Sequence, residues 1–223
     1  MQKAKPILFS APMVRAILRE IEQPGAGKTQ TRRISKKQDW PEKVVRRWPR
    51  QTACVPYAPG DMLWVRETCA ALEAHDGVDC IRYEADQVWQ PIANDAVASC
   101  AWVDLHHYGK KRGANVPSIH MPRWASRITL EVTDVRVERL QDIHEADAIA
   151  EGLIKLPATG RYVVGKGEQY LERSSLAART AYAWLWDDIN GPGAWDANPW
   201  VVAVSFKPHL INVDAFLSAR EAA

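Results

Sequence analysis

The residues best suited to chemistry lie in one short segment, residues 27–33, with the sequence GKTQTRR. This segment gathers one amine, two hydroxyls and two guanidiniums, and it directly follows a short amphipathic stretch. All five groups donate hydrogen bonds, and the three cations do so with a positive charge. We therefore expect the segment to face an anionic or carbonyl-bearing partner.

A phosphate-binding P-loop is the first alternative, because Gly25, Gly27 and Lys28 resemble the end of that motif. The motif requires a glycine five residues before Gly27, where this chain has Glu22, and it follows a strand and precedes a helix. Here a helical pattern comes first and is broken by Pro-Gly. The residues of that pattern are Pro12 in the first turn, then Val14, Ile17, Leu18 and Ile21. The sequence therefore excludes a P-loop and predicts a strand over residues 28–34.

Length and composition favour one compact domain over residues 1–208, with room for a second small lobe. The chain has 223 residues, of which 47% are hydrophobic, enough to bury a core. Its apolar runs are too short to cross a bilayer, and residues 1–9 lack the apolar stretch of a signal peptide. We therefore expect a cytoplasmic protein without a membrane partner.

No metal or cofactor is expected. The four cysteines, at positions 54, 69, 80 and 100, show no zinc-ligand spacing and are interpreted as reduced, mostly buried thiols. The histidines at positions 106 and 107 are adjacent, and the other four lack a companion at a metal-ligand interval. A triad of Ser118, His120 and Asp134 would lack the sharp turn that exposes a nucleophilic serine.

Charge is distributed unevenly along the chain. Residues 1–50 hold thirteen Lys/Arg against four Asp/Glu, a net charge of +9, whereas the remainder has a net charge of −7. The later basic residues of this segment are Lys36, Lys37, Lys43, Arg46, Arg47 and Arg50, with Trp40 and Trp48 between them. Cations beside aromatic rings are typical of a surface for single-stranded nucleic acid. A solvated basic face with packed indoles is the alternative.

The rest of the chain is predicted to be mainly β. The Pro-Gly-Asp turn at residues 59–61 leads into a strand over residues 62–68. Roughly residues 70–120 are interpreted as an inserted, partly irregular segment with one strand at residues 80–83. Further elements are a strand over residues 127–137, a helix from 174 or 175 to 188, a strand over 200–206, and a loosely attached helical tail over 209–223. The residues of this helix predicted to face inward are Leu176, Thr180, Trp184, Leu185 and Ile189.

A capped helix is predicted from Asp142 to Ala150. Asp142 can accept hydrogen bonds from amides of the first turn while Glu145 reaches back, which makes a capping box. Glu151 and Gly152 end the helix, because glycine tolerates the left-handed backbone common at this point. A carboxylate there opposes the helix dipole, at a cost of roughly a few tenths of a kcal/mol unless a cation lies near. Glu151 is therefore a candidate functional residue.

The elements and motifs of most of residues 5–207, taken in their order along the chain, resemble the ASCH family. The order is a short helix, a Gly-Lys-x-x-Thr-x-Arg strand, a Pro-Gly-Asp turn into a hydrophobic strand, a long strand, a helix ending in Glu-Gly, and a final strand. The stretches WVRET, SIHMPRWASR and LWD with NGPG are similar to a longer ASCH-like group encoded by phages and prophages. The resemblance implies an α+β fold with a small, mixed PUA-like β-barrel flanked by helices, and a place in the bacterial host cytoplasm.

The resemblance also implies a chemistry. ASCH members that hydrolyse the amide of N4-acetylcytidine use a lysine, a threonine and a glutamate, which match Lys28, Thr31 and Glu151. Lys28 would be the base, with a pKa lowered by Arg32, Arg33 and partial burial. Thr31 would supply the nucleophile, Glu151 would hold the exocyclic amine or deliver a proton, and Arg33 would polarise the acyl carbonyl. Because Lys28 and Thr31 would point to opposite faces of a regular strand, Lys28 must precede the strand.

Four other residues are candidates for substrate binding. Tyr83 and Trp124 could stack on a base, with core packing as the alternative. Arg66 and Glu67 could also contact substrate, with a self-contained surface ion pair as the alternative.

Three hypotheses of function follow. The first is an amidohydrolase that acts on a modified nucleobase or nucleoside without a cofactor. The second is a non-catalytic module that binds RNA or single-stranded nucleic acid. The third is a phage assembly or host-interaction protein that keeps the site only as structure.

Overall fold

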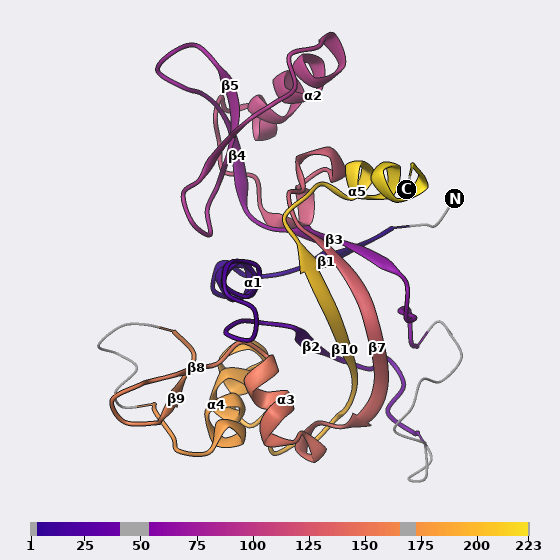
Figure 1. Ribbon diagram of the computed structural model, residues 1–223, viewed down its shortest axis with the longest axis vertical. Coiled ribbons are helices and arrows are strands. Elements are labelled where there is room, and N and C mark those ends of the chain that lie inside the picture. The colour runs from indigo at the N-terminus through magenta and orange to yellow at the C-terminus, as the bar shows by residue number, and fades with distance from the viewer. Residues whose placement is uncertain (1–3, 41–53, 166–172, 223) are drawn as a thin grey trace. The chain divides into compact units, whose positions relative to one another are not determined.

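The computed structural model describes residues 4–40, 54–165 and 173–222. They form a mixed α+β structure that separates into two compact units (Figure 1). Within the described residues, unit 1 comprises residues 16–62 and 130–209, and unit 2 comprises residues 4–15, 63–129 and 210–222. No helix of the described chain is long and apolar enough to span a membrane.

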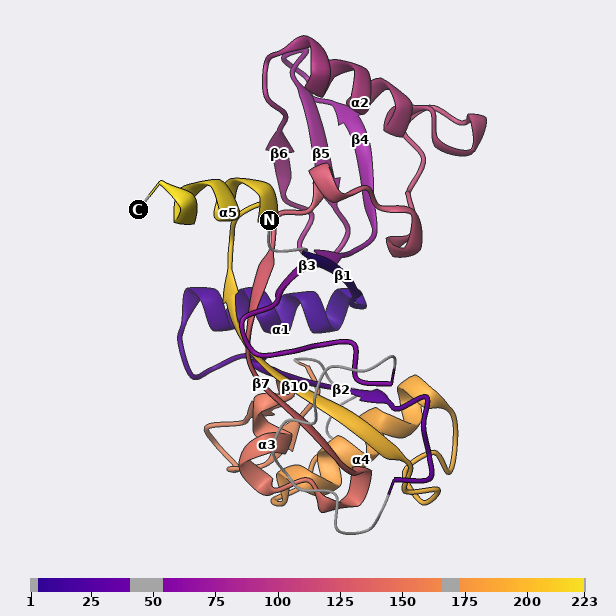
Figure 2. The same cartoon turned by 90° about the vertical axis from the view of Figure 1, so that its right-hand side faces the viewer.

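The sheet of unit 1 has the strand order β7 (Thr129–Arg139), β10 (Trp200–His209), β2 (Gln30–Ile34). β2 pairs antiparallel with β10, and Thr31 lies opposite Val204. β7 and β10 lie side by side in both Figure 1 and Figure 2. The three predicted strands are confirmed, although β2 begins two residues later than expected and β10 extends further. The strands of the described residues have an open order, so the barrel implied by the resemblance stays a prediction.

Unit 1 also contains helices and a short antiparallel pair of strands. The elements are the second half of α1 (Ala11–Glu22), the short turn η4 (Leu140–Asp142), α3 (Glu145–Ala150), β8 (Ile154–Lys155), β9 (Tyr162–Val163) and α4 (Ala178–Asn190). The predicted inner stripe of α4 is confirmed at Leu185 and wrong at its other positions. Its buried residues are Ala178, Ala181, Tyr182, Leu185 and Trp186, whereas Leu176 and Ile189 are 67% and 60% exposed. Both sides of this segment carry large apolar residues, so spacing alone could not select the buried side.

The predicted capping box is also wrong, because α3 begins at Glu145 rather than after Asp142. Its N-cap residue, His144, makes no side-chain capping bond. The carboxylate of Glu145 instead accepts hydrogen bonds from the backbone N–H groups of Ala178 (2.7 Å) and Arg179 (3.2 Å), at the start of α4. Glu145 therefore caps a different helix, and α3 is fixed to α4. The predicted helix end is confirmed, since Gly152 adopts a φ of +100° directly after Glu151.

Unit 2 is more regular than its sequence predicts. β1 (Lys5–Leu8) pairs in parallel with β3 (Met62–Arg66), and a separate antiparallel sheet joins β4 (Cys69–Glu73), β5 (Asp79–Tyr83) and β6 (Trp89–Pro91). The helical elements are α2 (Ala96–His106), η1 (Tyr108–Lys110), η2 (Ser118–His120), η3 (Arg123–Ala125) and α5 (Val213–Glu221). The sequence predicted an inserted, partly irregular segment here, with one strand at residues 80–83 that β5 confirms. The other strands were not predicted, because strands of three to five residues lack a sustained periodic signal.

The C-terminal helix is confirmed, and it is attached to unit 2 at its first turn. The side-chain amide of Asn212 donates to the carbonyl oxygens of Arg123, Trp124 and Ser126. Its side-chain oxygen caps α5 by accepting from the N–H of Asp214. This part of the predicted tail is therefore held in place by hydrogen bonds.

Candidate active site

Lys28 lies just before β2, between the middle of α1 and the end of α3. Its backbone N–H donates to the carbonyl of Ala16 in α1, and the next N–H, of Thr29, donates to Ala150 at the end of α3; both distances are 2.9 Å. A Cβ on the preceding Gly27 would lie 2.3 Å from the backbone nitrogen of Glu20, so only glycine allows this close approach to α1. The predicted position of Lys28 before the strand is confirmed.

The side chain of Lys28 pairs with Glu151. The ammonium Nζ lies 2.5 Å from Glu151 Oε2 and 2.9 Å from the carbonyl oxygen of Glu151, and the two side chains are only 1% and 4% exposed. A carboxylate at the end of α3 is unfavourable beside the helix dipole. The ammonium of Lys28 compensates for this cost, which explains the local misfit seen in the sequence.

Arg32 holds the other oxygen of Glu151. Its Nη1 lies 3.0 Å from Glu151 Oε1, and its Nη2 lies 2.7 Å from Glu138 Oε1 and 3.4 Å from Asp147 Oδ2. Arg136 supplies a further cation 3.0 Å from Asp147. We call Lys28, Arg32, Arg136, Glu138, Asp147 and Glu151 the charge network of unit 1. Its three cations and three carboxylates are mutually compensating, as buried charges require.

The network sets the protonation of its members. Burial lowers the pKa of Lys28 below its ordinary value; Glu151 acts in the opposite direction, and the charges of Arg33 and Arg32 lower it further. Burial also disfavours a charged Arg32, but Glu151 and Glu138 outweigh it and raise the pKa of that guanidinium. Lys28 therefore loses its proton more readily than Arg32.

Thr31 lies in β2 with a different partner. Its side chain is buried, and its hydroxyl Oγ1 accepts a hydrogen bond of 2.7 Å from Arg33 Nη1. The structure therefore brings Lys28 to Glu151 and Thr31 to Arg33. The two pairs are coupled by charge, because the guanidinium of Arg33 lowers the pKa of Lys28.

Tyr182 is a member of the site that the sequence did not predict. Its ring faces the guanidinium of Arg32 at 6.0 Å, and its hydroxyl interacts with Glu151. Burial, followed by the negative charge of Glu151, raises the pKa of Tyr182 well above its ordinary value, so the phenol stays protonated. Tyr182 could have been identified only from the buried face of α4, and the apolar spacing of that segment did not include Tyr182 among the inward-facing residues.

Two predicted substrate-binding residues, Glu67 and Tyr83, belong to a separate cluster in unit 2. Glu67 is buried and bound bidentately by Arg127 at 2.9 and 3.0 Å, while Arg127 also binds Asp86 at 2.8 Å. The ring of Tyr83 lies 3.9 Å from the guanidinium carbon of Arg127. The expected surface pairing of Glu67 with Arg66 is therefore wrong, and both Glu67 and Tyr83 are core residues of this unit.

The other two candidates also lie in unit 2. Arg66 places its guanidinium 5.3 Å from the ring of Trp64 and donates to the carbonyl of Ile119. Trp124 is partly buried and lines a cavity described below. The predicted substrate-binding residues are thus divided between Arg33 in unit 1 and four residues in unit 2.

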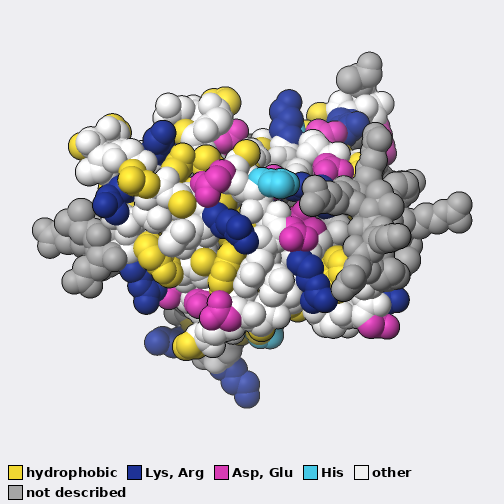
Figure 3. Space-filling view, turned by 90° about the horizontal axis from the view of Figure 1, so that it is seen from below, with side chains coloured by type: hydrophobic (Ala, Val, Ile, Leu, Met, Phe, Trp, Pro, Cys, Tyr) yellow, Lys and Arg dark blue, Asp and Glu magenta, His cyan; other side chains and the backbone are white. Residues whose placement is uncertain are grey.

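The basic N-terminal surface is described only in part. Lys36 is exposed, while Lys37 places its ammonium 5.2 Å from the ring of Trp40, whose indole N–H donates to Ser35. The remaining predicted residues, Lys43, Arg46, Arg47, Trp48 and Arg50, lie outside the described residues. On the face drawn in Figure 3, the visible basic and acidic side chains are interspersed. The described residues therefore show Trp40 covered by a cation from its own chain.

No protein-family model, curated protein or solved structure matches this chain. What the site can do therefore follows from its own residues. These are a buried ammonium with a lowered pKa, a carboxylate held by two cations, and a hydroxyl bonded to a guanidinium.

Proposed function

We propose that this protein hydrolyses the amide of an N4-acylated cytosine or cytidine, and that unit 1 is a PUA-like barrel of the ASCH type. The observation that carries the proposal is the buried contact between Lys28 and Glu151, 2.5 Å apart. The order of β2, β7, the Glu-Gly helix end and β10 in unit 1 agrees with the order of the ASCH motifs. An N-acyl cytosine has carbonyl oxygens that accept hydrogen bonds, and Arg33, which is half-buried and bonded to Thr31, is the donor of residues 27–33 proposed to meet them.

In the proposed reaction the hydroxyl of Thr31 attacks the acyl carbonyl carbon. Neutral Lys28 takes the hydroxyl proton, and the tetrahedral intermediate collapses when the C–N bond breaks and the same proton passes to the leaving exocyclic nitrogen. Water then attacks the acyl ester on Thr31, which releases the carboxylic acid and restores the hydroxyl. The products are the free cytosine or cytidine and the carboxylate.

Electrostatics support these roles. A general base must lose its proton near neutral pH, and burial together with Arg32 and Arg33 lowers the pKa of Lys28. The hydrogen bond of 2.7 Å from Arg33 to Thr31 Oγ1 favours negative charge on that oxygen during attack. Glu151, fixed by Lys28 and Arg32, is a rigid acceptor for an exocyclic amine.

The test uses purified protein incubated with N4-acetylcytidine, with cytidine and acetate measured by chromatography. Thr31→Ser keeps the nucleophile, whereas Thr31→Val keeps the shape and removes it. We expect Thr31→Ser to retain activity and Thr31→Val to lose about 10²–10⁴-fold. No cytidine above that from a Lys28→Ala control would remove the amidohydrolase hypothesis.

Binding of RNA or single-stranded DNA is the second candidate, favoured by the net charge of +9 over residues 1–50. Phosphate neutralisation predicts an affinity for oligonucleotides that falls steeply as salt is raised. Fluorescence anisotropy with a labelled single strand, measured at several salt concentrations, checks it. Affinity that is absent or independent of salt would remove this candidate.

A further inference from the structure

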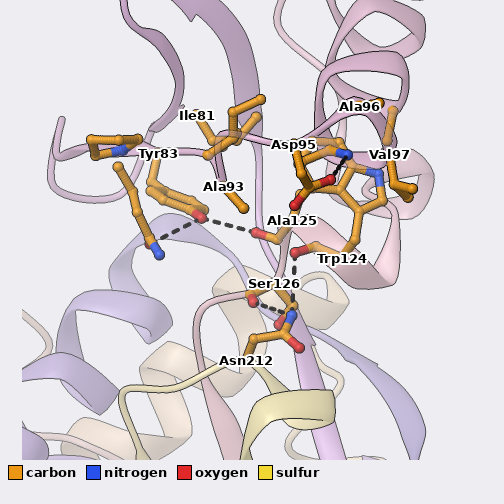
Figure 4. Close-up of a pocket in the computed structure, with 15 residues that line it drawn as sticks. Ile81, Tyr83, Ala93, Asp95, Ala96, Val97, Trp124, Ala125, Ser126 and Asn212 are labelled. Carbon is orange, nitrogen blue, oxygen red and sulfur yellow. Dashed lines mark hydrogen bonds between the residues drawn. The ribbon is translucent and has the colours of Figure 1, made fainter.

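Unit 2 contains a cavity of about 750 Å³, formed entirely by its own residues. Figure 4 shows this cavity, with Tyr83 and Trp124 on either side of Ala125 and with Asp95 beside Trp124. Its volume lies within the range of small-molecule sites in proteins. None of the residues assigned to the hydrolytic site, Lys28, Thr31 and Glu151, lines it.

The walls of the cavity are mainly apolar and small. β5 supplies Ile81 and Tyr83, the start of α2 supplies Ala98, and Trp124 adds an indole ring. Alanines along α2 leave open space where larger side chains would fill it. Apolar walls with one aromatic face favour a planar, largely apolar ligand.

Most polar groups at the cavity already have partners. The amide of Asn212 donates to three carbonyl groups, Ser126 donates to the carbonyl of Val65, and the hydroxyl of Tyr83 donates to the carbonyl of Ala125 at 2.9 Å. These bonds shape the wall and leave little capacity for a ligand.

Asp95, a solvent-exposed residue at the rim of the cavity, keeps free acceptor capacity. Its Oδ1 caps α2 by accepting from the N–H of Ala98 at 2.9 Å, while its Oδ2 has no hydrogen-bond partner among the described residues. Asp95 is the only charged side chain that lines this cavity, and no Lys or Arg accompanies it within the described lining. The charge that side chains bring to the cavity is therefore negative, and it is balanced only in part by the N-terminus of α2, which Asp95 caps.

We infer that this cavity binds a small aromatic molecule that carries a cationic amidine or amine. The ring packs against Trp124 and the apolar wall, and the cationic group donates to Asp95. This binding is separate from the proposed hydrolysis, since it requires neither Lys28 nor Thr31.

Three probes with the same ring test the inference on the full chain. Benzamidine is cationic, benzamide is neutral and benzoate is anionic, so their dissociation constants, measured by ligand-observed NMR titration, isolate the effect of charge. We expect benzamidine to bind about tenfold more tightly than benzoate, with benzamide between them, as one partly exposed ion pair allows. Equal affinities, the reverse order, or no binding by any probe would overturn the inference.

Matched variants locate the site. Asp95→Asn keeps a good helix cap and removes the charge, so the preference for benzamidine over benzamide should vanish. Asp104→Asn, on the same helix and outside the lining, should leave that preference unchanged. Ala98→Phe should abolish binding of all three probes by filling the cavity, while Val103→Phe, which is 45% exposed and outside the lining, should not. Loss of the preference in Asp104→Asn, or binding unaffected by Ala98→Phe, would contradict the site.

Discussion

Lys28 and Glu151, 123 residues apart in sequence, are joined through both their side chains and their backbones. Their side chains form an ion pair of 2.5 Å, and their backbones form an antiparallel bridge. The contact fixes the start of β2 to the end of α3 and places an ammonium whose pKa burial lowers beside a rigid carboxylate. Stability and proposed chemistry therefore depend on the same pair.

The first prediction concerns the cost of breaking this pair. Lys28→Met leaves Glu151 buried with one cation instead of two and should lower the free energy of unfolding by about 3–5 kcal/mol. Urea denaturation measures it. Arg173→Met is the control, because the pair of Arg173 with Asp188 is exposed and its loss should scarcely move the denaturation midpoint. Similar losses in both variants would show that burial does not matter to the pair.

The second prediction separates backbone strain from steric overlap at Gly152. Gly152 and Gly191 have φ values of +100° and +101°, but a Cβ at Gly152 would lie 2.8 Å from Ala16 Cβ, whereas none of the described atoms lies within 4 Å at Gly191. Alanine at either position should cost about 1–3 kcal/mol from the backbone. Gly152→Ala should cost about 1–3 kcal/mol more, because it pushes on α1 and on Lys28. Thermal unfolding of both variants checks this, and equal costs would contradict the close packing.

The third prediction concerns acid stability. Burial raises the pKa of Asp147, but the hydrogen bond and charge of Arg136, with Arg32 and Gln30, outweigh it and hold the pKa below its ordinary value of 3.8. A depressed folded-state pKa adds stability above 3.8 that is lost as pH falls through the folded value. Wild type should therefore lose more stability than Asp147→Asn below pH 3.8.

Urea denaturation across this acid range measures the difference. Asp39→Asn, which removes an exposed carboxylate of the same unit, controls for the change in net charge. Parallel curves for wild type and Asp147→Asn would contradict the role of the charge network in acid stability.

The fourth prediction concerns the pH dependence of N4-acetylcytidine hydrolysis. If neutral Lys28 is the base, kcat/KM rises with pH through its pKa, which lies below the ordinary 10.5. The charge of Arg33 lowers that pKa, so Arg33→Gln should move the inflection to higher pH in addition to slowing the reaction. Arg179→Gln, in the same unit, should leave the inflection in place. An unmoved inflection in Arg33→Gln would assign the titration to another group.

The resemblance implied that Lys28 and Glu151 share a site, and the residues themselves gave two local signals. A glycine before Lys28 indicated an unusual turn, and a carboxylate at a helix end indicated a nearby cation. The sequence allowed an arginine as a partner of Glu151 but did not identify Arg32, because the partner of a strand residue depends on which face the helices cover. It likewise missed that Glu145 caps α4, since that partner lies 33 residues further along the chain and no local pattern encodes it.

The positions of β7 and β10 along the chain could be predicted because these strands are 11 and 10 residues long and carry regular apolar residues. In the sheet of β4, β5 and β6 only β5 was predicted, at residues 80–83, since strands of three to five residues give little periodic signal. The pairing of buried Arg127 with Glu67 and Asp86 could not be predicted either, because charged residues are expected to face solvent.

The most direct measurement compares hydrolysis of N4-acetylcytidine by wild type and Lys28→Arg. Arginine keeps the positive charge beside Glu151 but does not lose its proton in proteins, so it preserves the ion pair and removes the base. At equal thermal stability, wild type should release cytidine and Lys28→Arg should be slower by about 10²–10⁴-fold. No cytidine from wild type, or equal rates in both proteins, would contradict the account.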